Sequence, residues 1–198
     1  MIVFDTEFSY SDFVKGGIFE IGAVDFENPK RKFFGQCRID DDNIISQEAM
    51  QITGMTEEKL RDKKKMSQKD LIKKFLAWCD KSKTKNFMGH CIHIDFGHIV
   101  SKARKYNIAY DFHWRAYDLH SMASQKYLEI NGKLLIKNNR SDMSLSKILE
   151  FCGMKDNRKI HNALEDAKLT AECFSRIVYG KNLIKEYRIF PLPKYLKR

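Results

Sequence analysis

The sequence predicts one α/β domain in which helices flank a mixed β-sheet. Two observations lead to this prediction. The N-terminal part reads as three short apolar strands joined by turn residues, which is typical of an antiparallel meander. From Ser67 onward, apolar residues recur at helical spacing, and short apolar stretches separate these segments. A meander followed by alternating helices and strands is typical of a mixed sheet with helices on its faces.

The expected elements follow from local patterns. Ser67 and Asp70 resemble a capping box at a helix start, and Gly153 and Gly180 stand where helices are expected to end. The turn between the second and third strands is expected near residues 28–30. We expect strands at residues 1–7, 18–26, 32–39, 86–89 and 114–119. We expect helices at residues 48–52, 57–60, 67–79, 95–103, 118–128, 145–151 and 162–179.

Charge points to an anionic partner. The chain has 36 Lys and Arg residues against 26 Asp and Glu residues, a net charge of +10. Because no long apolar or amphipathic anchor accompanies this surplus, a polyphosphate is favoured over a membrane, and we expect no membrane association. The alternative is that the lysines only aid solubility.

Cysteine usage favours a reducing compartment. The cysteines are dispersed and odd in number, with no C-x-x-C pair, which favours reduced thiols in the cytoplasm over disulfides or a zinc site. We expect no signal peptide, because the chain opens directly on a core strand. The five residues are Cys37, Cys79, Cys91, Cys152 and Cys173.

Two carboxylates, Asp5 and Glu7, end the first strand after an apolar run. Side chains alternate between the faces of a strand, so both carboxylates project to the same side. Two partly buried like charges raise each other's pKa unless a cation compensates them, and hard oxygen ligands favour Mg²⁺ or Mn²⁺. A solvated strand end is the alternative when this stretch is taken alone.

Further candidates lie at the starts of two helices. Asp95 is expected in the first turn of a helix that follows a strand. If Asn162 is the N-cap of the last helix, His161 is the residue before the cap and Asp166 is the fourth helical residue. Residues at these positions touch in a hydrophobic staple, so the same backbone would place an imidazole beside a carboxylate. Taken singly, such an Asp is more often a helix-dipole contact, and such a His a capping or surface residue.

Together, these candidates suit phosphoryl transfer. The four carboxylates can neutralise two divalent ions, which clamp the attacking and leaving oxygens of an in-line displacement. A histidine that titrates near neutrality is the usual general base. The basic surplus would attract a polyanionic substrate. The set consists of Asp5, Glu7, Asp95, Asp166 and His161.

The order of these motifs resembles the DEDDh 3′-to-5′ exonucleases, a group that includes proofreading exonucleases and RNase T-like enzymes. The resemblance rests on FDTE, EIGAV, GHCIHIDF and HNALEDAKLTAECF and covers about residues 2–178. It implies a ribonuclease H-like fold with a five-stranded sheet. It also implies a metal-dependent hydrolase that releases nucleoside 5′-monophosphates from the 3′ ends of single-stranded RNA or DNA.

The resemblance implies a role for each candidate. Asp5 would bridge two Mg²⁺ or Mn²⁺ ions, Glu7 would bind the tighter ion and contact the terminal nucleotide, and Asp166 would complete that ion's site. Asp95 would support the second ion, partly through water, and His161 would deprotonate the attacking water. The sequence departs from the family pattern at Phe8-Ser9-Tyr10, where a small turn is frequent, at His90-Cys91 and at Ile94.

Substrate contacts are expected from the aromatic residues after the first strand. Phe8, Tyr10 and Phe13 could stack on terminal bases; packing of Phe8 in the core and of the other two within the loop is the alternative. Residues 1–180 are expected to form the exonuclease domain and 181–198 a basic C-terminal tail, which could track phosphates, bind a partner or fray.

Other functions stay open at this stage. One is a proofreading subunit that associates with a polymerase, and another is a non-catalytic nucleic-acid-binding module, which the intact set of five residues disfavours. A homodimer is possible but not indicated. The sequence does not distinguish RNA from DNA.

Overall fold

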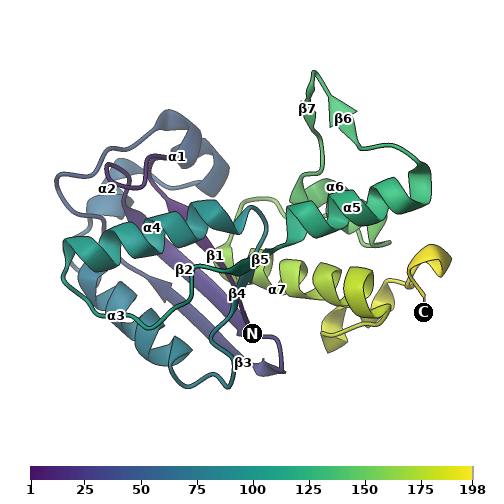
Figure 1. Cartoon of the computed structure of the whole chain (residues 1–198). Helices are drawn as coiled ribbons and strands as arrows, with labels where there is room; N and C mark the ends of the chain where they lie inside the picture. The colour runs from purple at the N-terminus through teal and green to yellow at the C-terminus, as the bar shows by residue number, and fades with distance from the viewer. Residues whose placement is uncertain (198) are drawn as a thin grey trace.

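A five-stranded mixed sheet lies at the centre of the molecule (Figure 1). The computed structural model describes residues 1–197. Its strand order is β3-β2-β1-β4-β5, with the first three strands antiparallel and the last three parallel. The strands are β1 (Ile2–Phe8), β2 (Ile18–Asp25), β3 (Asn28–Gln36), β4 (Phe87–Gly89) and β5 (Ala116–Asp118). The mixed sheet that begins with a meander is therefore confirmed.

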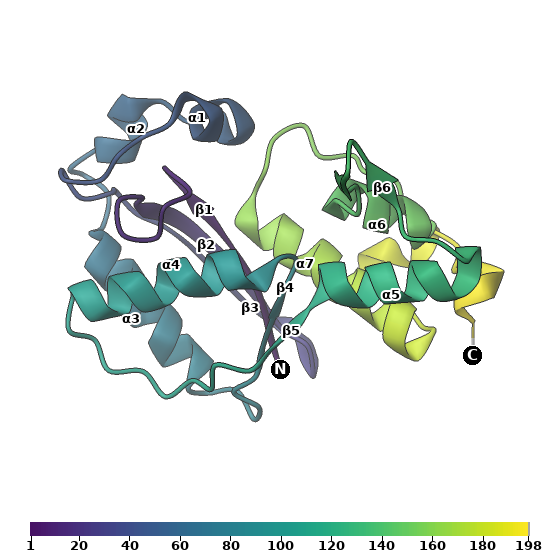
Figure 2. The ribbon, with the colours of Figure 1, turned by 45° about the horizontal axis from the view of Figure 1, so that its top comes forward.

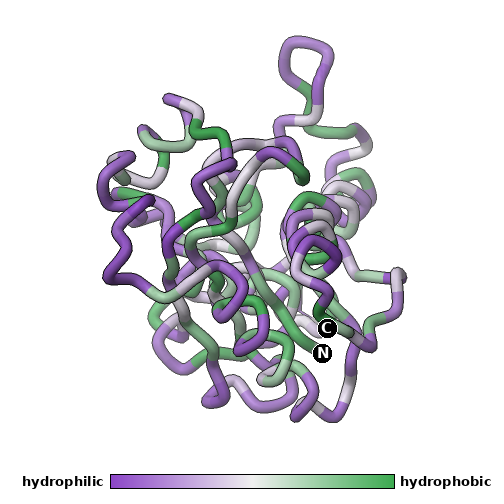
Figure 3. The backbone as a smooth tube through the Cα atoms, turned by 90° about the vertical axis from the view of Figure 1, so that its left-hand side faces the viewer, coloured by the Kyte–Doolittle hydropathy of each residue, from purple (hydrophilic) through white to green (hydrophobic). Residues whose placement is uncertain are grey.

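Helices cover both faces of this sheet (Figures 1 and 2). Ile2 and Phe4 of β1 pack with α3 and α4, whereas Met1 and Val3 belong to the cluster formed by α5, α6 and α7. This alternation follows from the two-residue period of a strand. The helices are α3 (Gln68–Cys79), α4 (Ile92–Lys105), α5 (Leu119–Asn131), α6 (Leu145–Phe151) and α7 (Ala163–Phe174). In Figure 3, hydrophobic stretches gather toward the interior of the molecule, and the outer loops are mostly hydrophilic.

Several helix starts agree with the predicted caps. Ser67 Oγ accepts a hydrogen bond from the Asp70 amide at 3.1 Å and donates one to its carboxylate at 2.6 Å. Asn162 Oδ1 accepts from the Glu165 amide at 3.1 Å. The two short helices between the meander and α3 are also present, as α1 (Gln47–Thr53) and α2 (Glu57–Arg61).

Two strand bounds differ from the prediction. The turn after β2 comes before Asn28, so Pro29 lies inside β3. Because β3 is an edge strand, a proline without an amide proton is tolerated there. Strand β5 is shorter than expected, which leaves Trp114 exposed outside it.

A small hairpin that the sequence analysis missed projects from the body of the molecule (Figure 1). It consists of β6 (Ile136–Lys137) and β7 (Arg140–Ser141) and lies between α5 and α6. Asn138 and Asn139 form its turn with φ angles of 49° and 60°. Two left-handed residues are what a tight two-residue hairpin turn requires, and asparagine adopts this conformation more readily than most residues.

The C-terminal segment packs against the core instead of fraying. After α7 the chain continues through a π-helical turn (Ser175–Tyr179) and two 3₁₀ turns (Lys185–Ile189 and Lys194–Leu196). Arg176 and Glu172 form a fully buried ion pair at 2.8 Å. The guanidinium also donates to carbonyls of the C-terminal segment, and the carboxylate accepts from two of its amides. Within residues 1–197, no helix has the length and apolar character needed to cross a membrane.

Candidate active site

Strand β1 presents Asp5 and Glu7 on the face covered by α7. In the antiparallel register with β2, Asp5 lies opposite Gly22 and Glu7 opposite Glu20. A Cβ atom at Gly22 would collide with the backbone at the start of α7, so only glycine allows the helix to approach this closely. The close approach brings the first turn of α7 directly over the two carboxylates. Both carboxylates line the same cavity, as the sequence predicted.

Glu20 fixes the start of α7 on the sheet. Its Oε1 atom accepts hydrogen bonds from the Ala163 amide at 2.8 Å and from the Asn162 side chain at 3.0 Å. Gln36 donates to the other oxygen at 2.6 Å. The sequence analysis did not assign this role to Glu20, although a carboxylate in the middle of an apolar strand was a usable signal.

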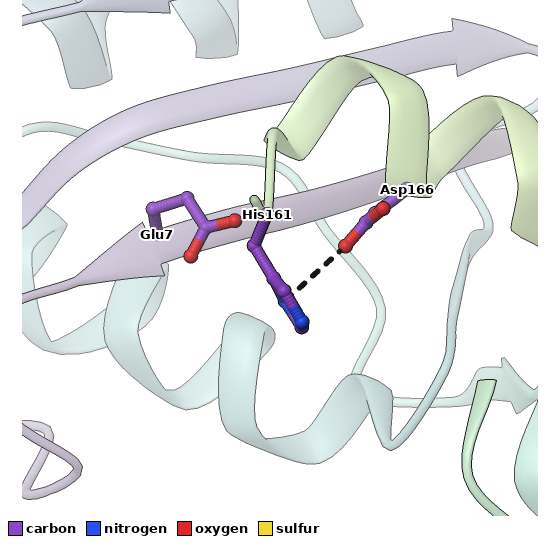
Figure 4. Close-up of side chains that lie close together, drawn as sticks. All are labelled: Glu7, His161 and Asp166. Carbon is purple, nitrogen blue, oxygen red and sulfur yellow. Dashed lines mark ion pairs between the residues drawn. The ribbon is translucent and has the colours of Figure 1, made fainter. Parts of the chain in front are cut away.

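His161 and Asp166 meet at the start of α7. The distance between His161 Nδ1 and Asp166 Oδ2 is 3.5 Å (Figure 4). The Asp166 side chain is 4% exposed, whereas the His161 side chain is 49% exposed and faces the cavity. The predicted contact between the residue before the cap and the fourth helical residue is therefore confirmed.

Asp95 reaches the same cavity from the other face of the sheet. Its Oδ1 atom accepts hydrogen bonds from the amide of Thr6 at 2.8 Å and from the Thr6 hydroxyl at 2.7 Å. Since Thr6 stands between Asp5 and Glu7, these bonds join the first turn of α4 to the acidic end of β1. Cys91 precedes α4 with a φ angle of 55°.

Burial and mutual repulsion raise the pKa values of these carboxyl groups. Burial, together with Asp95, Glu7 and Asp166, raises the pKa of Asp5. Burial and the charges of Asp166 and Glu20 raise the pKa of Glu7 to about 8. Burial raises the pKa of Asp95 to about 7, against the lowering effect of its hydrogen bonds from Thr6. Burial also raises the pKa of Asp166. The cluster thus has more negative charge than the protein compensates.

The donor set fits a divalent cation. Glu7 Oε1 is buried and has no hydrogen-bond partner among residues 1–197. One ligand atom from each of Glu7, His161 and Asp166 lies within 4.8 Å of the others (Figure 4). Carboxylate oxygens are ligands that hard divalent cations prefer, and such a cation would compensate the like charges.

Arg158 supplies the one nearby positive charge that the sequence analysis missed. Its Nη1 atom donates to Asp166 Oδ1 at 3.0 Å. Asp156 accepts hydrogen bonds from Nε and Nη2 of the same guanidinium at 2.9 and 2.7 Å, and Nη2 also donates to the hydroxyl of Ser146. Arg158 is thereby held in place and in turn orients the carboxylate of Asp166. No motif singled it out, because it lies in the irregular segment before His161.

A cavity of about 460 Å³ opens over these groups. Phe8 and Tyr10 line it, together with residues of α1 and Ile94 of α4. Phe13 does not line it and instead packs edge-on against His98, the ring centroids lying 5.2 Å apart.

His98 is part of the wall behind Phe8. The two rings stack with their centroids 4.3 Å apart. His98 is fully buried, and neither ring nitrogen has a hydrogen-bond partner in the described chain. Burial lowers its pKa to about 4, so the ring is neutral at physiological pH. It therefore acts as an aromatic support for Phe8.

Comparison with known proteins agrees with this geometry. The family model RNase_T, described as an exonuclease, matches residues 2–174. The chain belongs to this exonuclease family. Members of the family depend on divalent metal ions, and a zinc-bound form of the exonuclease I–single-stranded DNA complex from E. coli is among the similar structures. No curated protein matches the chain.

Solved structures share the fold at low identity. The nuclease domain of 3′hExo, a DEDDh family member bound to rAMP, has a TM-score of 0.67 at 17% identity, with 93% of this chain and 94% of that one covered. A 3′-exonuclease that recognises the histone mRNA stem-loop has a TM-score of 0.69 at 17% identity, with 92% of this chain and 64% of that one covered. E. coli exonuclease I in complex with a 5cy-dT13 oligonucleotide has a TM-score of 0.70 at 18% identity, with 91% of this chain and 40% of that one covered. The ribonuclease H-like fold is confirmed, and this exonuclease chain spans under two thirds of the latter two proteins.

Proposed function

We propose that this protein is a metal-dependent 3′-to-5′ exonuclease that removes nucleoside 5′-monophosphates from single-stranded nucleic acid. The observation that carries the proposal is the convergence of four carboxylates and one histidine from β1, α4 and the start of α7: Asp5, Glu7, Asp95 and His161 line a single cavity, and Asp166 lies against His161. Such a set suits hydrolysis of a phosphodiester bond. An intact set also disfavours a purely binding role.

Four carboxylates would hold two Mg²⁺ or Mn²⁺ ions, which polarise the phosphate and stabilise the charge on the attacking and leaving oxygens. Asp5 would contribute to both sites. Glu7 and Asp166 would complete one of them, and Asp95, held by Thr6, would support the other.

His161 acts as the general base. Asp166 Oδ2 lies beside Nδ1 and orients the ring, so Nε2 is the nitrogen left to take a proton from water. The water oxygen attacks the phosphorus, and the 3′-oxygen of the preceding nucleotide leaves and takes a proton from solvent to become a hydroxyl. The products are a nucleoside 5′-monophosphate and a strand shortened by one nucleotide. The half-exposed ring faces the cavity, where it can return its proton to solvent.

The terminal nucleotide would occupy the cavity. Phe8 and Tyr10 provide aromatic surfaces that suit stacking on a base of any sequence. Phe13, the third expected contact, supports this wall indirectly through His98. The similar structures include both an oligo-dT complex and an rAMP complex, and either sugar is compatible with the proposal.

Two further expectations accompany the proposed activity. We place the exonuclease domain in residues 1–180, with the basic segment 181–198 as an extension that packs on it and not as a separate domain. We place the protein in the cytoplasm, because all five cysteines are unpaired.

The test is the degradation of 5′-labelled RNA and DNA, single- and double-stranded, with Mg²⁺, Mn²⁺ or EDTA. A ladder that shortens from the 3′ end only with metal is expected. Asp5→Ala should abolish it while leaving the circular dichroism spectrum unchanged, and Asp111→Ala, an exposed residue outside the cavity, is the matched control. Internal cuts, or full activity in EDTA, would contradict the proposal.

A further inference from the structure

The hairpin between α5 and α6 carries unpartnered positive charge. We define the arm as residues 133–141. All of its residues are exposed except Leu135, which is half-buried and packs on the core. Lys133, Lys137 and Arg140 are its charged residues, and no acidic residue lies within it. Among the ion pairs of residues 1–197, none involves these three side chains.

Two of these cations face each other across the hairpin. Lys137 pairs with Arg140 in the antiparallel register of β6 and β7. Like charges directly opposite each other destabilise a strand pair. A bound anion between the two side chains would relieve this repulsion.

The base of the arm is attached to the wall of the catalytic cavity. His90, which lines the cavity, contacts the Met143 carbonyl through Nε2 at 3.1 Å. His120 contacts the Ser141 hydroxyl at 2.8 Å, and the Asp142 amide donates to the Leu135 carbonyl at 3.0 Å. These bonds fix the arm relative to the residues that precede α4.

The arm rises on the same side of the molecule as α1, which forms part of the cavity wall. Figures 1 and 2 both show β6 and β7 on the same upper side as α1, and α1 supplies Glu48, Ala49, Ile52 and Thr53 to the cavity wall. A strand whose 3′ end lies in the cavity and which leaves it on this side would pass the arm. In Figure 3 the tip of the loop projecting at the top is hydrophilic, which suits contact with a polyanion.

We propose that the arm binds the sugar-phosphate backbone of the substrate strand upstream of the nucleotide being removed. Lys133, Lys137 and Arg140 contact phosphates, while Leu134 and Ile136, which are 49% and 54% exposed, contact sugars or bases. The inference rests on the proposed exonuclease function. It adds to that function a second binding region whose contribution depends on the length of the strand.

The test compares two triple variants that remove the same charge. Lys133→Ala/Lys137→Ala/Arg140→Ala removes the arm cations, and Lys69→Ala/Lys73→Ala/Lys74→Ala removes three exposed cations from α3, which packs on the other part of the sheet. Substrates are 5′-labelled single strands of two to twenty nucleotides. For the longest strand, KM of the arm variant should rise about tenfold. The slope of log KM against log salt concentration should also be smaller by about 2 in the arm variant, since three phosphate contacts are lost and each contributes about 0.7 on a single strand.

The dinucleotide extends least beyond the cavity and serves as the internal reference. The strand length at which the two variants begin to differ measures how far the arm lies from the cavity. Equal losses for both variants, or equal losses for dinucleotide and long strand, would overturn the inference. An arm variant whose KM and salt dependence equal those of the parent would also overturn it, and this result would assign the arm to a protein partner instead.

A binding measurement separates this inference from the proposed function. Fluorescence anisotropy with a labelled twenty-nucleotide strand requires no turnover. If the parent chain binds the strand without degrading it, the exonuclease proposal fails. The difference in anisotropy-measured affinity between the parent and the arm variant still tests whether the arm binds the strand. Because the three substituted residues are exposed, melting temperatures of both variants should match the parent within about 2 °C.

Discussion

The imidazole of His161 lies beside the carboxylate of Asp166, with Nδ1 and Oδ2 3.5 Å apart, although one residue precedes α7 and the other lies within it. The Asn162 side chain caps α7, and the side chains of His161 and Asp166 point toward each other (Figure 4). This relationship assigns different tasks to the two groups. Asp166 is nearly buried and suits metal binding, whereas the half-exposed imidazole can exchange protons with water.

Replacing His161 should therefore affect turnover more than metal binding. His161→Ala is expected to lower kcat by about 10²–10⁴-fold, the usual contribution of a general base. The rise in melting temperature caused by Mg²⁺ should change much less, because the four carboxylates are intact. His113→Ala, an exposed histidine outside the cavity, is the control. A variant that retains full turnover would remove His161 from the mechanism.

The stability of the metal-free protein should fall as pH rises toward 8. The pKa of Glu7 is raised from 4.5 to about 8, so the folded protein holds a proton that the unfolded chain releases. This contribution is fully present below the unfolded value and is lost as pH rises through the folded value. Asp95, with a pKa raised to about 7, acts in the same direction.

His98 has the opposite effect at lower pH. Its pKa is lowered from 6.5 to about 4, so its contribution is present above 6.5 and is lost as pH falls toward 4. Above pH 6.5 the effect of Glu7 and Asp95 remains. Because these two groups release their protons in this range, melting temperatures in EDTA should decline between about pH 6.5 and 8.5, and Glu7→Gln should reduce the decline. Saturating Mg²⁺ should remove it, because the cation replaces the protons. A flat profile in EDTA would contradict the buried acidic cluster.

Arg158 should behave as a positioning residue for Asp166. Its guanidinium is held by Asp156 and donates to Asp166 Oδ1. Substitution of groups that orient metal ligands typically costs about 10–100-fold in metal affinity or activity. We expect Arg158→Ala to weaken Mg²⁺ binding by that factor, measured by titrating activity against Mg²⁺. Arg188→Ala, an exposed arginine of the C-terminal segment, is the control. Tighter Mg²⁺ binding in Arg158→Ala would show that the guanidinium competes with the metal.

The buried pair of Arg176 and Glu172 should be essential for stability. Removing one partner leaves an uncompensated buried charge, which costs about 3–5 kcal/mol. Arg176→Met is therefore expected to lower the free energy of unfolding by that amount, measured by urea denaturation. Arg176→Met combined with Glu172→Gln, which removes both charges, should recover part of the loss. Equal stability of the parent and the single variant would contradict this role.

Much of the fold could be predicted because local chemistry and global structure agree. Ser67 and Asn162 are caps in the structure, and the alternation along β1 places Asp5 and Glu7 on one face. The relation between His161 and Asp166 followed from cap geometry alone. Asp95 was a candidate from its place in the first turn of a helix, and the resemblance then implied its role. Its contact with Thr6 joins segments that are 89 residues apart.

The missing features depend on contacts between distant segments. Arg158 takes its role from Asp156 and Asp166, and nothing in its own surroundings distinguishes it from other basic residues. The arm has two-residue strands, which are too short for a periodic pattern. The C-terminal segment looked like a tail because its buried residues, Ile184, Tyr187 and Leu196, stand among lysines and arginines.

The attachment of α7 to β2 has a consequence for the synthesis of the protein. Glu20 holds the Asn162 side chain, a contact between residues 142 positions apart, and Asp5 needs Asp166 beside it to form the metal site. A chain still emerging from the ribosome carries the acidic strand but lacks its partners. The candidate site therefore assembles only after the chain has been synthesised through the start of α7.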